Sequence, residues 1–312
     1  MDLQLTAAAG TEAPTLRSAL LRGAGFLRAA GIDSAQIDVE VLLRHVLGIE
    51  KAQLYSALDE PLSGGHRLQF EEMLNRRVRR EPVAYITGRK EFWSLDFVVT
   101  PKALIPRPET ELLVEVALHC LKSTKSRRPN ILDLGTGSGI IAVCLAKERL
   151  EANILAVDIA SPALAVARIN ARRHGVSERI DLIHGDLFAA LGAKKPLFDL
   201  IVANPPYIRT GELPLLAPEI RQWEPMTALD GGPDGMEYYR RIIGEANDYL
   251  APGNSIVLEI DADMAPVVTE LFACCGCYGP AFVYQDYAGK DRVIAAIKLP
   301  VSNPAPKGAK RG

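Results

Sequence analysis

Short apolar runs alternate with helical patterns from residue 130 onward, and this alternation restricts the possible fold more than any other feature of the chain. Strands that are apolar on both faces and separated by helices are typical of a parallel sheet covered by helices on both sides. The sequence therefore predicts an α/β fold with a mostly parallel, Rossmann-like sheet. The predicted strands are Ile131–Leu134, Ile154–Val157, Ile180–Ile183, Leu200–Ala203 and Ile256–Ile260, a terminal strand pair is predicted at Phe282–Asp286 and Arg292–Lys298, and the predicted helices are Glu109–Leu121, Ile140–Lys147, Pro162–His174 and Gly235–Leu250.

The N-terminal part of the chain carries helical patterns with no strands between them. Apolar residues recur at helical spacing from Leu16 onward, and Asp33 with Gln36 forms a capping-box pattern before a second amphipathic stretch. A third stretch follows Ser63, which is expected to cap it. We therefore predict a small helical bundle over residues 1–83.

Three further segments complete the predicted organisation. Residues 84–105 contain β-rich runs at Tyr85–Gly88 and Phe92–Val99 with turn residues between them, which indicates a β-hairpin linker. The segment 106–299 holds the alternating region and is predicted to form one domain. The remaining residues, 300–312, are small, Pro-rich and basic, so we expect them to be disordered.

The first strand of the alternating region ends in the glycine-rich turn Gly135-Thr136-Gly137-Ser138-Gly139. Glycines allow a tight turn and a close approach of the backbone to a ligand, and the helix that follows offers free N–H groups. A dinucleotide fingerprint would require a further glycine at position 140, which is Ile140. The pattern is not that of a phosphate-binding P-loop either, so a nucleoside triphosphate is not the expected ligand.

Acidic residues follow the next two predicted strands. Asp158 stands 19 residues after Gly139, where a carboxylate can accept hydrogen bonds from both ribose hydroxyls; the alternative is that it caps the next helix. Asp186 follows the third strand, and with Leu187 or Phe188 it could contact an adenine ring, although an Asp is also common in turns. Together with the glycine loop, these strand ends resemble the cofactor side of class I S-adenosylmethionine-dependent methyltransferases.

The fourth predicted strand ends in Asn204-Pro205-Pro206-Tyr207. The two prolines stiffen the chain and cannot donate hydrogen bonds, while their carbonyl groups remain acceptors. Ligands bind at the carboxyl ends of strands in sheets of this kind, so the motif is expected to face the same site as the glycine loop. The alternative interpretation is a rigid turn without a chemical role.

The residue types in this motif suit the methylation of a planar amino group. The nitrogen of an amide or arylamine is a poor nucleophile because its lone pair is delocalised. The Asn204 side-chain oxygen and the Pro205 carbonyl could hold its two N–H groups out of plane, and Tyr207 could stack on the planar group. Such catalysis depends on positioning and electrostatics, and no metal is required.

Asn-Pro-Pro-Tyr is similar to the motif shared by adenine-N(6) nucleic-acid methyltransferases and glutamine-N(5) protein methyltransferases, and both substrates present a planar NH₂ group. The rest of the chain resembles the PrmC/HemK family over about residues 16–297. The segments that carry this resemblance are Glu81–Gly88, Glu91–Leu95, Leu104–Glu111, Trp223–Pro225, Ala228–Gly235, Asp286-Tyr287 and Arg292-Val293.

The resemblance implies that the protein methylates the glutamine of the Gly-Gly-Gln motif in class-1 peptide chain release factors, using S-adenosyl-L-methionine. It implies a class I methyltransferase domain preceded by a helical domain that recognises the substrate and by the hairpin linker. The residues it assigns to the cofactor are Gly135, Thr136, Gly137, Ser138, Gly139, Asp158, Asp186, Leu187 and Asn204. Those it assigns to the glutamine amide are Asn204, Pro205, Pro206 and Tyr207, with Arg107 and Glu109 at the border of the site.

Two departures from the family pattern concern the edge of the site. The family tends to carry Gly and Gln shortly after the strand that ends near Glu259, whereas this chain continues Ile260-Asp261-Ala262-Asp263-Met264. The change is expected to affect local packing or an edge contact and not activity. The aromatic residue that often follows the third acid is Leu187 here, so adenine would meet an aliphatic side chain.

The charge and composition of the chain limit the kinds of partner that it is expected to bind. The net charge is −2 and the pI about 6.3, whereas proteins held to nucleic acid by charge are usually far more basic. No apolar run is long enough to span a bilayer and no signal peptide is apparent, so no membrane association is expected. Five cysteines, three of them within Cys274–Cys277, form no disulfide framework. We expect a cytoplasmic monomer that binds a protein substrate and makes no direct contact with nucleic acid.

The densest basic run is Arg76-Arg77-Val78-Arg79-Arg80. It could be a solvated helix end, where cations also suit the helix dipole, or it could dock an acidic face of the protein partner.

Two alternative functions remain open beside the glutamine methyltransferase. One is an adenine-N(6) methyltransferase acting on DNA or RNA, and the other is a non-catalytic protein that binds the ribosome or a release factor and keeps an inactive methyltransferase fold.

Overall fold

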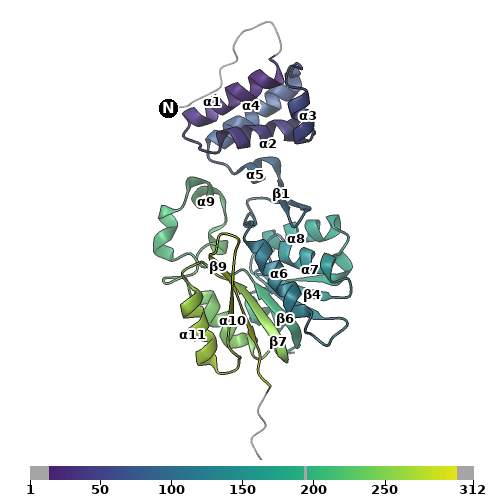
Figure 1. Ribbon diagram of the computed structural model, residues 1–312, viewed down its shortest axis with the longest axis vertical. Coiled ribbons are helices and arrows are strands. Elements are labelled where there is room, and N and C mark those ends of the chain that lie inside the picture. The colour runs from purple at the N-terminus through teal and green to yellow at the C-terminus, as the bar shows by residue number, and fades with distance from the viewer. Residues whose placement is uncertain (1–13, 193–194, 301–312) are drawn as a thin grey trace, which may run out of the picture. The chain divides into compact units, whose positions relative to one another are not determined.

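In the part of the chain that the computed structural model describes, residues 14–192 and 195–300, seven strands form one sheet in the order β5-β4-β3-β6-β7-β9-β8 (Figure 1). The first five strands in this order, β5, β4, β3, β6 and β7, are parallel to one another. The last two are antiparallel: β9 pairs with β7, and β8 pairs with β9. The predicted sheet, including its terminal strand pair, is confirmed. The strands are β3 (Asn130–Leu134), β4 (Asn153–Asp158), β5 (Ile180–His184), β6 (Phe198–Ala203), β7 (Leu250–Glu259), β8 (Phe282–Gln285) and β9 (Asp291–Ile297).

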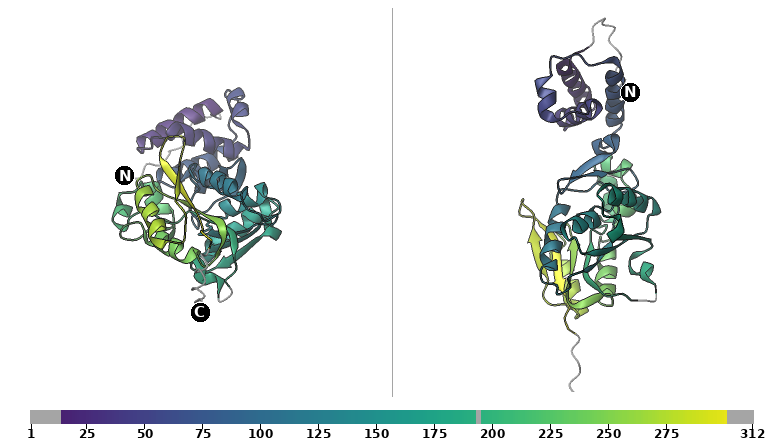
Figure 2. Two further views of the ribbon diagram at one scale, coloured as in Figure 1. Left: turned by 60° about the horizontal axis from the view of Figure 1, so that its bottom comes forward. Right: turned by 90° about the vertical axis from the view of Figure 1, so that its right-hand side faces the viewer.

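Helices cover both faces of this sheet because alternate strand residues point to opposite sides. Ile131 of β3 packs with the first group of helices, and its neighbour Leu132 packs with the second. Figures 1 and 2 show the two layers on either side of the strands. The first group is α6 (Thr110–Leu121), α7 (Ile140–Glu148) and α8 (Ser161–Arg173), and the second is α10 (Glu237–Ala246) and α11 (Ala265–Cys275).

The strand order places a topological switch point between β3 and β6. From β3 the chain runs outward to β4 and β5, and it then returns to the other side of β3 for β6 and β7. The crevice at the carboxyl ends of the strands on either side of such a reversal is where ligands bind in sheets of this kind. The glycine loop after β3 and the Asn-Pro-Pro-Tyr motif after β6 therefore flank the same crevice.

One predicted helix is too long at its C-terminal end. The prediction ran from Gly235 to Leu250, but α10 ends at Ala246, and Leu250 already begins β7. Leu250 pairs with Phe198 of β6, and the register then shifts before Leu200. The apolar residues at the end of the helical pattern are thus buried by strand pairing instead of helix packing.

The chain divides into two units, of which the first comprises residues 1–89 and 216–224 and the second comprises 90–215 and 225–312. Residues 1–13 of the predicted bundle and 301–312 of the predicted tail lie outside the described residues. Within the two described ranges, no helix combines the length and the apolar character that a membrane crossing requires. The first unit contains α1 (Leu16–Ala29), α2 (Ala35–Leu47), α3 (Lys51–Ser56), α4 (Gly64–Val78), α5 (Val83–Thr87) and α9 (Pro218–Trp223).

Helix capping in the first unit differs in part from the prediction. Ser63 caps α4 as expected, because its side chain accepts a hydrogen bond from the His66 N–H. The predicted capping box at Asp33 is wrong: α2 is preceded by Ser34, which makes no capping bond, and Gln36 accepts a hydrogen bond from Arg28 instead. The observed capping box lies at the start of α3.

The predicted hairpin exists, but its first strand lies later in the chain than predicted. The strands are β1 (Arg89–Phe92) and β2 (Leu95–Val98), whereas residues 85–87 belong to the helix α5. Pro82 stands at the start of α5 and Gly88 ends it in the left-handed conformation, so local capping outweighs the β-rich composition. Four short 3₁₀ helices complete the described elements: η1 (Ser177–Arg179), η2 (Leu187–Leu191), η3 (Thr210–Leu215) and η4 (Met226–Ala228).

In the basic run at the end of α4, three of the four arginines form ion pairs and Arg79 is exposed. Arg77 is buried, and its guanidinium lies 2.7 Å from the Asp38 carboxylate and 3.0 Å from that of Glu219 on α9. Arg80 also binds Glu219, and Arg76 binds Glu81. These charges are used inside the first unit, so the partner-docking hypothesis for the run is not supported.

Candidate functional site

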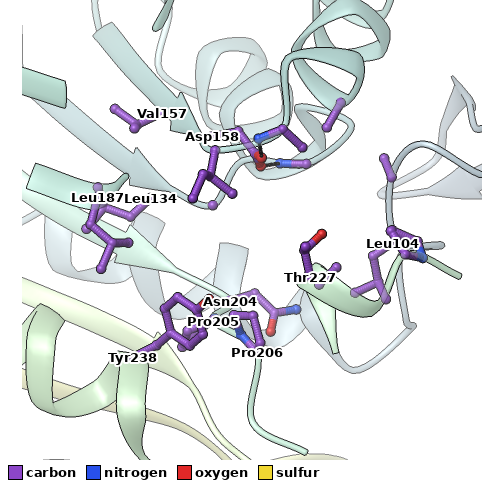
Figure 3. A pocket seen from close by; sticks show the side chains of 18 of the residues that line it. Leu104, Leu134, Val157, Asp158, Leu187, Asn204, Pro205, Pro206, Thr227 and Tyr238 are labelled. Carbon is purple, nitrogen blue, oxygen red and sulfur yellow. Dashed lines mark hydrogen bonds between the residues drawn. The ribbon is translucent and has the colours of Figure 1, made fainter. Parts of the chain in front are cut away.

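A cavity opens at the carboxyl ends of β3, β4 and β6, at the predicted switch point (Figure 3). It holds about 790 Å³ of space, counting the part that opens to solvent, which is a size suited to a small ligand. All its walls come from the second unit. The lining residues are Lys102, Ala103, Leu104, Leu134, Gly135, Gly137, Val157, Asp158, Ile159, Ala160, Ala163, Gly185, Asp186, Leu187, Asn204, Pro205, Pro206, Pro225, Thr227, Ala228, Tyr238 and Ile242.

The glycine loop contributes backbone to the cavity through Gly135 and Gly137. Both glycines, and Gly139 after them, have positive φ angles that only glycine adopts without strain. Gly139 does not line the cavity, and its role is close packing: a Cβ atom there would lie 2.8 Å from the Cβ of Ala167 on α8. Two glycines of the loop therefore expose its backbone to the cavity, and the third allows the start of α7 to pack closely against α8.

Thr136 and Ser138, the other two residues of the glycine loop, fix its conformation through hydrogen bonds to the protein interior. The Thr136 hydroxyl donates a hydrogen bond of 2.6 Å to the Asp133 carboxylate, and the Ser138 carbonyl accepts one from the buried amide of Asn170. Thr136 and Ser138 are buried and do not line the cavity. Burial raises the pKa of Asp133 to about 7, and its second carboxyl oxygen has no partner among the described residues.

Asp158 at the end of β4 faces the cavity with both carboxylate oxygens already oriented (Figure 3). One oxygen accepts a hydrogen bond of 2.7 Å from the Gly137 N–H, and the other accepts one of 2.8 Å from the Ala160 N–H. Burial raises the pKa of the carboxyl group, and these two bonds oppose that rise. Because each oxygen keeps a free lone pair, the side chain can still accept hydrogen bonds from a ligand.

Asp186, Leu187 and Tyr238 also line the cavity. Asp186 is held by an ion pair of 2.7 Å with Arg241, and Leu187 adopts a positive φ of 45° that turns it into the cavity wall. Phe188 does not face the cavity. It is buried in the core, where its ring stacks on Tyr249, so contact of Phe188 with a ligand ring is excluded in this arrangement.

Asn204, Pro205 and Pro206 line the cavity close to Tyr238 (Figure 3). Tyr207 does not line it; the ring is largely buried, and burial raises the pKa of its hydroxyl to about 12, with Glu259 and Asp261 adding to the rise. The motif thus presents an amide side chain and two proline residues to the cavity.

A glycine-rich segment braces the backbone of this motif. The Ile208 N–H donates to the Leu229 carbonyl, and the Gly231 N–H donates to the Ile208 carbonyl. A Cβ atom at Gly231 would lie 2.7 Å from the Cα of Tyr207, and one at Gly235 would lie 2.5 Å from its carbonyl oxygen. The run Ala228–Gly235 therefore needs its glycines in order to lie against the motif.

Arg107 and Glu109 do not line the cavity, but their charges act on Tyr207 and Glu259 near the candidate site. Arg107 lowers the pKa of Tyr207, and Glu109 raises that of Glu259. Glu109 is exposed and stands immediately before α6. Their assignment to substrate binding stays a prediction, as does the assignment of Thr136, Ser138, Gly139 and Tyr207 to ligand contact.

Several residues at the site have no counterpart in the sequence prediction. Tyr238 lines the cavity from α10, where an aromatic at helical spacing indicates only a core position. Leu104 comes from a loop in a segment that carries the family resemblance, whereas Thr227 lies in η4, between two such segments, and had no sequence signal. Thr110 belongs to the segment Leu104–Glu111, which carries the family resemblance, whereas no motif singles out Glu259. Both residues interact with the Asn204 side chain.

Comparison with known proteins covers nearly the whole chain. A model of the PrmC N-terminal domain matches residues 18–88, and a model of the methyltransferase small domain matches residues 109–217. The release factor glutamine methyltransferase of Geobacter sulfurreducens is 42% identical over 290 residues, which is 91% of this chain and 98% of that protein. The protein of the same name from Moorella thermoacetica is 42% identical over 284 residues, with coverage of 91% and 99%.

Among solved structures, the hMettl16 catalytic domain bound to an RNA hairpin aligns with a TM-score of 0.54, covering 76% of this chain and 84% of that one. Its identity is 14%, so the likeness shows a shared methyltransferase fold and nothing about the substrate. Identity of about two residues in five, along almost the full length of both chains, is far more specific. The protein has a class I methyltransferase fold with a helical N-terminal domain, and it belongs to the family of release factor glutamine methyltransferases.

Proposed function

We propose that this protein methylates the side-chain amide nitrogen of the glutamine in the Gly-Gly-Gln motif of class-1 peptide chain release factors. The products would be N(5)-methylglutamine and S-adenosylhomocysteine. The observation that carries the proposal is that the glycine loop, Asp158 and Asn204-Pro205-Pro206 line one cavity. Relatives that bear the name release factor glutamine methyltransferase support the choice of substrate.

The cavity suits S-adenosyl-L-methionine, which supplies a methyl group on a positively charged sulfur. Gly135 and Gly137 allow the backbone to approach the methionine part closely, and Asp158 can accept hydrogen bonds from the ribose hydroxyls. Asp186 and Leu187 would contact the adenine, with Tyr238 offering the ring face that the Leu at position 187 lacks. Two carboxylates in the walls also favour a cationic ligand over an anionic one.

The Asn-Pro-Pro-Tyr motif would hold the glutamine amide. The Asn204 side-chain oxygen and the Pro205 carbonyl are acceptors for its two N–H groups, and holding them there favours a nitrogen lone pair that is free to attack. Tyr207, Pro206, Arg107 and Glu109 would complete the substrate side of the site. The residues thus act by positioning and by excluding water, with no covalent intermediate on the protein.

The test is transfer of labelled methyl from S-adenosyl-L-methionine to a purified class-1 release factor. A release-factor variant with Gln→Ala in its Gly-Gly-Gln motif and a DNA duplex run beside it. We expect label on the unaltered release factor alone. Label on the DNA would instead support the adenine-N(6) alternative, and cofactor binding without label on any substrate would support the non-catalytic one.

A further inference from the structure

Glu259 is a buried acid beneath the candidate site, and nothing in the proposed function uses it. It is the last residue of β7, and its neighbour Leu258 pairs with Ala203 at the end of β6, so Glu259 lies beside Asn204. Only 3% of the residue is exposed. A charged group so deeply buried is costly unless hydrogen bonds or ion pairs compensate it, which makes its contacts informative.

A short chain of hydrogen bonds joins Glu259 to the Asn204 side chain. The Asn204 Nδ2 donates to the Thr110 Oγ1 at 3.4 Å. Both side chains lie within hydrogen-bonding reach of the Glu259 carboxylate and lower its pKa, while its Oε2 atom is buried with no partner among the described residues. The backbone of Glu259 is fixed as well, because the Tyr239 hydroxyl donates to its carbonyl at 2.7 Å. Thr110 is 4% exposed, so water does not compete for these bonds.

The chemistry of the three side chains determines the direction of this chain. A hydroxyl can donate or accept, so Thr110 alone would accept either orientation of the Asn204 amide. An ionised carboxylate can only accept, so Thr110 must donate to Glu259 and is left to accept from the amide NH₂. The Asn204 oxygen then points away from the two acceptors.

We propose that Glu259 is a positioning residue that locks the Asn204 amide with its nitrogen toward the protein and its oxygen free for the substrate. The inference rests on the proposed function, in which Asn204 must accept a hydrogen bond from the glutamine NH₂. A rotated Asn204 would present its own NH₂ to that group, placing two donors against each other. Glu259 acts through Asn204 and does not itself need to touch the substrate.

This arrangement also makes the site sensitive to pH. Burial raises the pKa of Glu259 to about 7, while the hydrogen bonds of Thr110 and Asn204 and the charge of Arg292 on β9 lower it. The other ionisable groups that interact with it are Glu109 before α6, Tyr207 and Tyr239 on α10, and Asp261 acts on the same two tyrosines. When Glu259 gains a proton it becomes a donor, so the lock weakens as the pH falls through about 7.

The test compares Glu259→Gln with the wild type and with Glu270→Gln, a control on the exposed surface of α11. Glutamine can donate to the Asn204 oxygen and so permits the wrong orientation. We expect kcat to fall about 10- to 100-fold, as when groups that orient a site residue are removed, with the affinity for S-adenosyl-L-methionine within twofold of wild type. The acid limb of kcat near pH 7 should be present in the wild type and control and absent in the variant.

Thr110→Val provides a second route that does not alter the buried charge. It removes the hydroxyl that links Glu259 to Asn204, so it should lower kcat to a similar extent. The double variant Thr110→Val/Glu259→Gln should be little worse than either single variant. Additive losses, or a Glu259→Gln variant with wild-type kcat and acid limb, would overturn the proposal. A variant that loses cofactor binding and kcat together would show a merely structural role.

A readout independent of turnover separates this inference from the proposed function. In the ligand-free protein, the Asn204 side-chain NH₂ should exchange slowly with solvent in NMR spectra, its signal being assigned by its loss in Asn204→Asp. Exchange should be faster in Glu259→Gln and unchanged in Glu270→Gln. If the wild type transfers no methyl to the release factor, the proposed function fails, whereas equal exchange in all three proteins refutes the lock.

Discussion

Asp158 shows how a single side chain can be prepared for a ligand before the ligand binds. Its two oxygens are fixed by the N–H groups of Gly137 and Ala160, one from the glycine loop and one from the start of α8. The carboxylate therefore links the end of β4 to the glycine loop. Because its side chain is already fixed, it loses little conformational entropy when a ligand binds. Sequence spacing predicted its place in the site but not this double anchoring, which depends on backbone groups that carry no sequence signal.

Asp158→Ala should mainly weaken the binding of S-adenosyl-L-methionine. The loss of charge-assisted hydrogen bonds to the ribose is expected to cost about 2 kcal/mol, or roughly 30-fold in affinity measured by calorimetry. Lys195→Ala, an exposed change outside the cavity, serves as the control. Unchanged affinity in Asp158→Ala would move the ribose site elsewhere.

Asn204→Ala should separate binding from turnover. Cofactor affinity should stay close to wild type, while kcat falls by a few orders of magnitude, about 3–5 kcal/mol in the activation barrier, because one acceptor for the glutamine amide is lost. Asn153→Ala at the exposed start of β4 is the matched control. Normal turnover in Asn204→Ala would remove the amide-positioning mechanism.

At this scale the sequence predicted the residues that carry motifs and missed those that do not. Gly135, Gly137, Asp158 and Asn204 were expected to meet, and they line one cavity. Glu259 stands between the apolar residues Ile256–Leu258 and Ile260, and the pattern alone gives no reason to connect it with Asn204. The connection arises from strand pairing, which places residues from distant parts of the chain side by side.

At the scale of elements, the glycine-rich segment 228–235 and the Asn-Pro-Pro-Tyr motif form one structure. Backbone hydrogen bonds join Ile208 to Leu229 and Gly231, and the glycines allow the two segments to touch. Such a brace limits how far the motif can move. The sequence showed both segments as family signatures, but only their contact explains why both are needed.

Gly231→Ala should displace the motif. Its new Cβ would lie 2.7 Å from the backbone of Tyr207, and backbone cannot move aside as a flexible side chain can. We expect a loss of about 1–3 kcal/mol in unfolding free energy and a larger loss of kcat. Gly244→Ala, on α10 with open space around it, should be neutral or slightly stabilising in the same denaturation and turnover assays. Equal behaviour of the two variants would contradict the brace.

The arginine of α4 provides a second test at this scale. Arg77→Met leaves the Asp38 and Glu219 carboxylates without their buried guanidinium, which should destabilise the helical unit by about 3 kcal/mol. Arg79→Met, whose side chain is exposed, should change the unfolding free energy little. Thermal or urea unfolding followed by circular dichroism measures both, and a silent Arg77→Met would show that the network contributes no stability. Charge counting could not foresee this role, because Glu219 lies 142 residues away along the chain.

At the scale of the whole molecule, alternation of strands and helices was enough to predict the class of fold, since few architectures bury such strands on both faces. The end of α10, the capping of α2 and the helix α5 were predicted wrongly, because each depends on a local or long-range contact that outweighs composition. The errors concern a helix end, a helix cap and one short element of the wrong type, and the strands of the large sheet, which position the site, were not affected.

The helical unit is discontinuous in sequence, since it needs residues 216–224 in addition to residues 1–89. During synthesis, the ribosome must therefore add 135 residues after position 89 before Glu219 and the rest of that segment can join the unit. At typical elongation rates this takes roughly 7 to 27 s. Over that interval Arg77 and Asp38 face each other without their third partner, so the N-terminal helices complete their packing only after most of the methyltransferase sheet has been made.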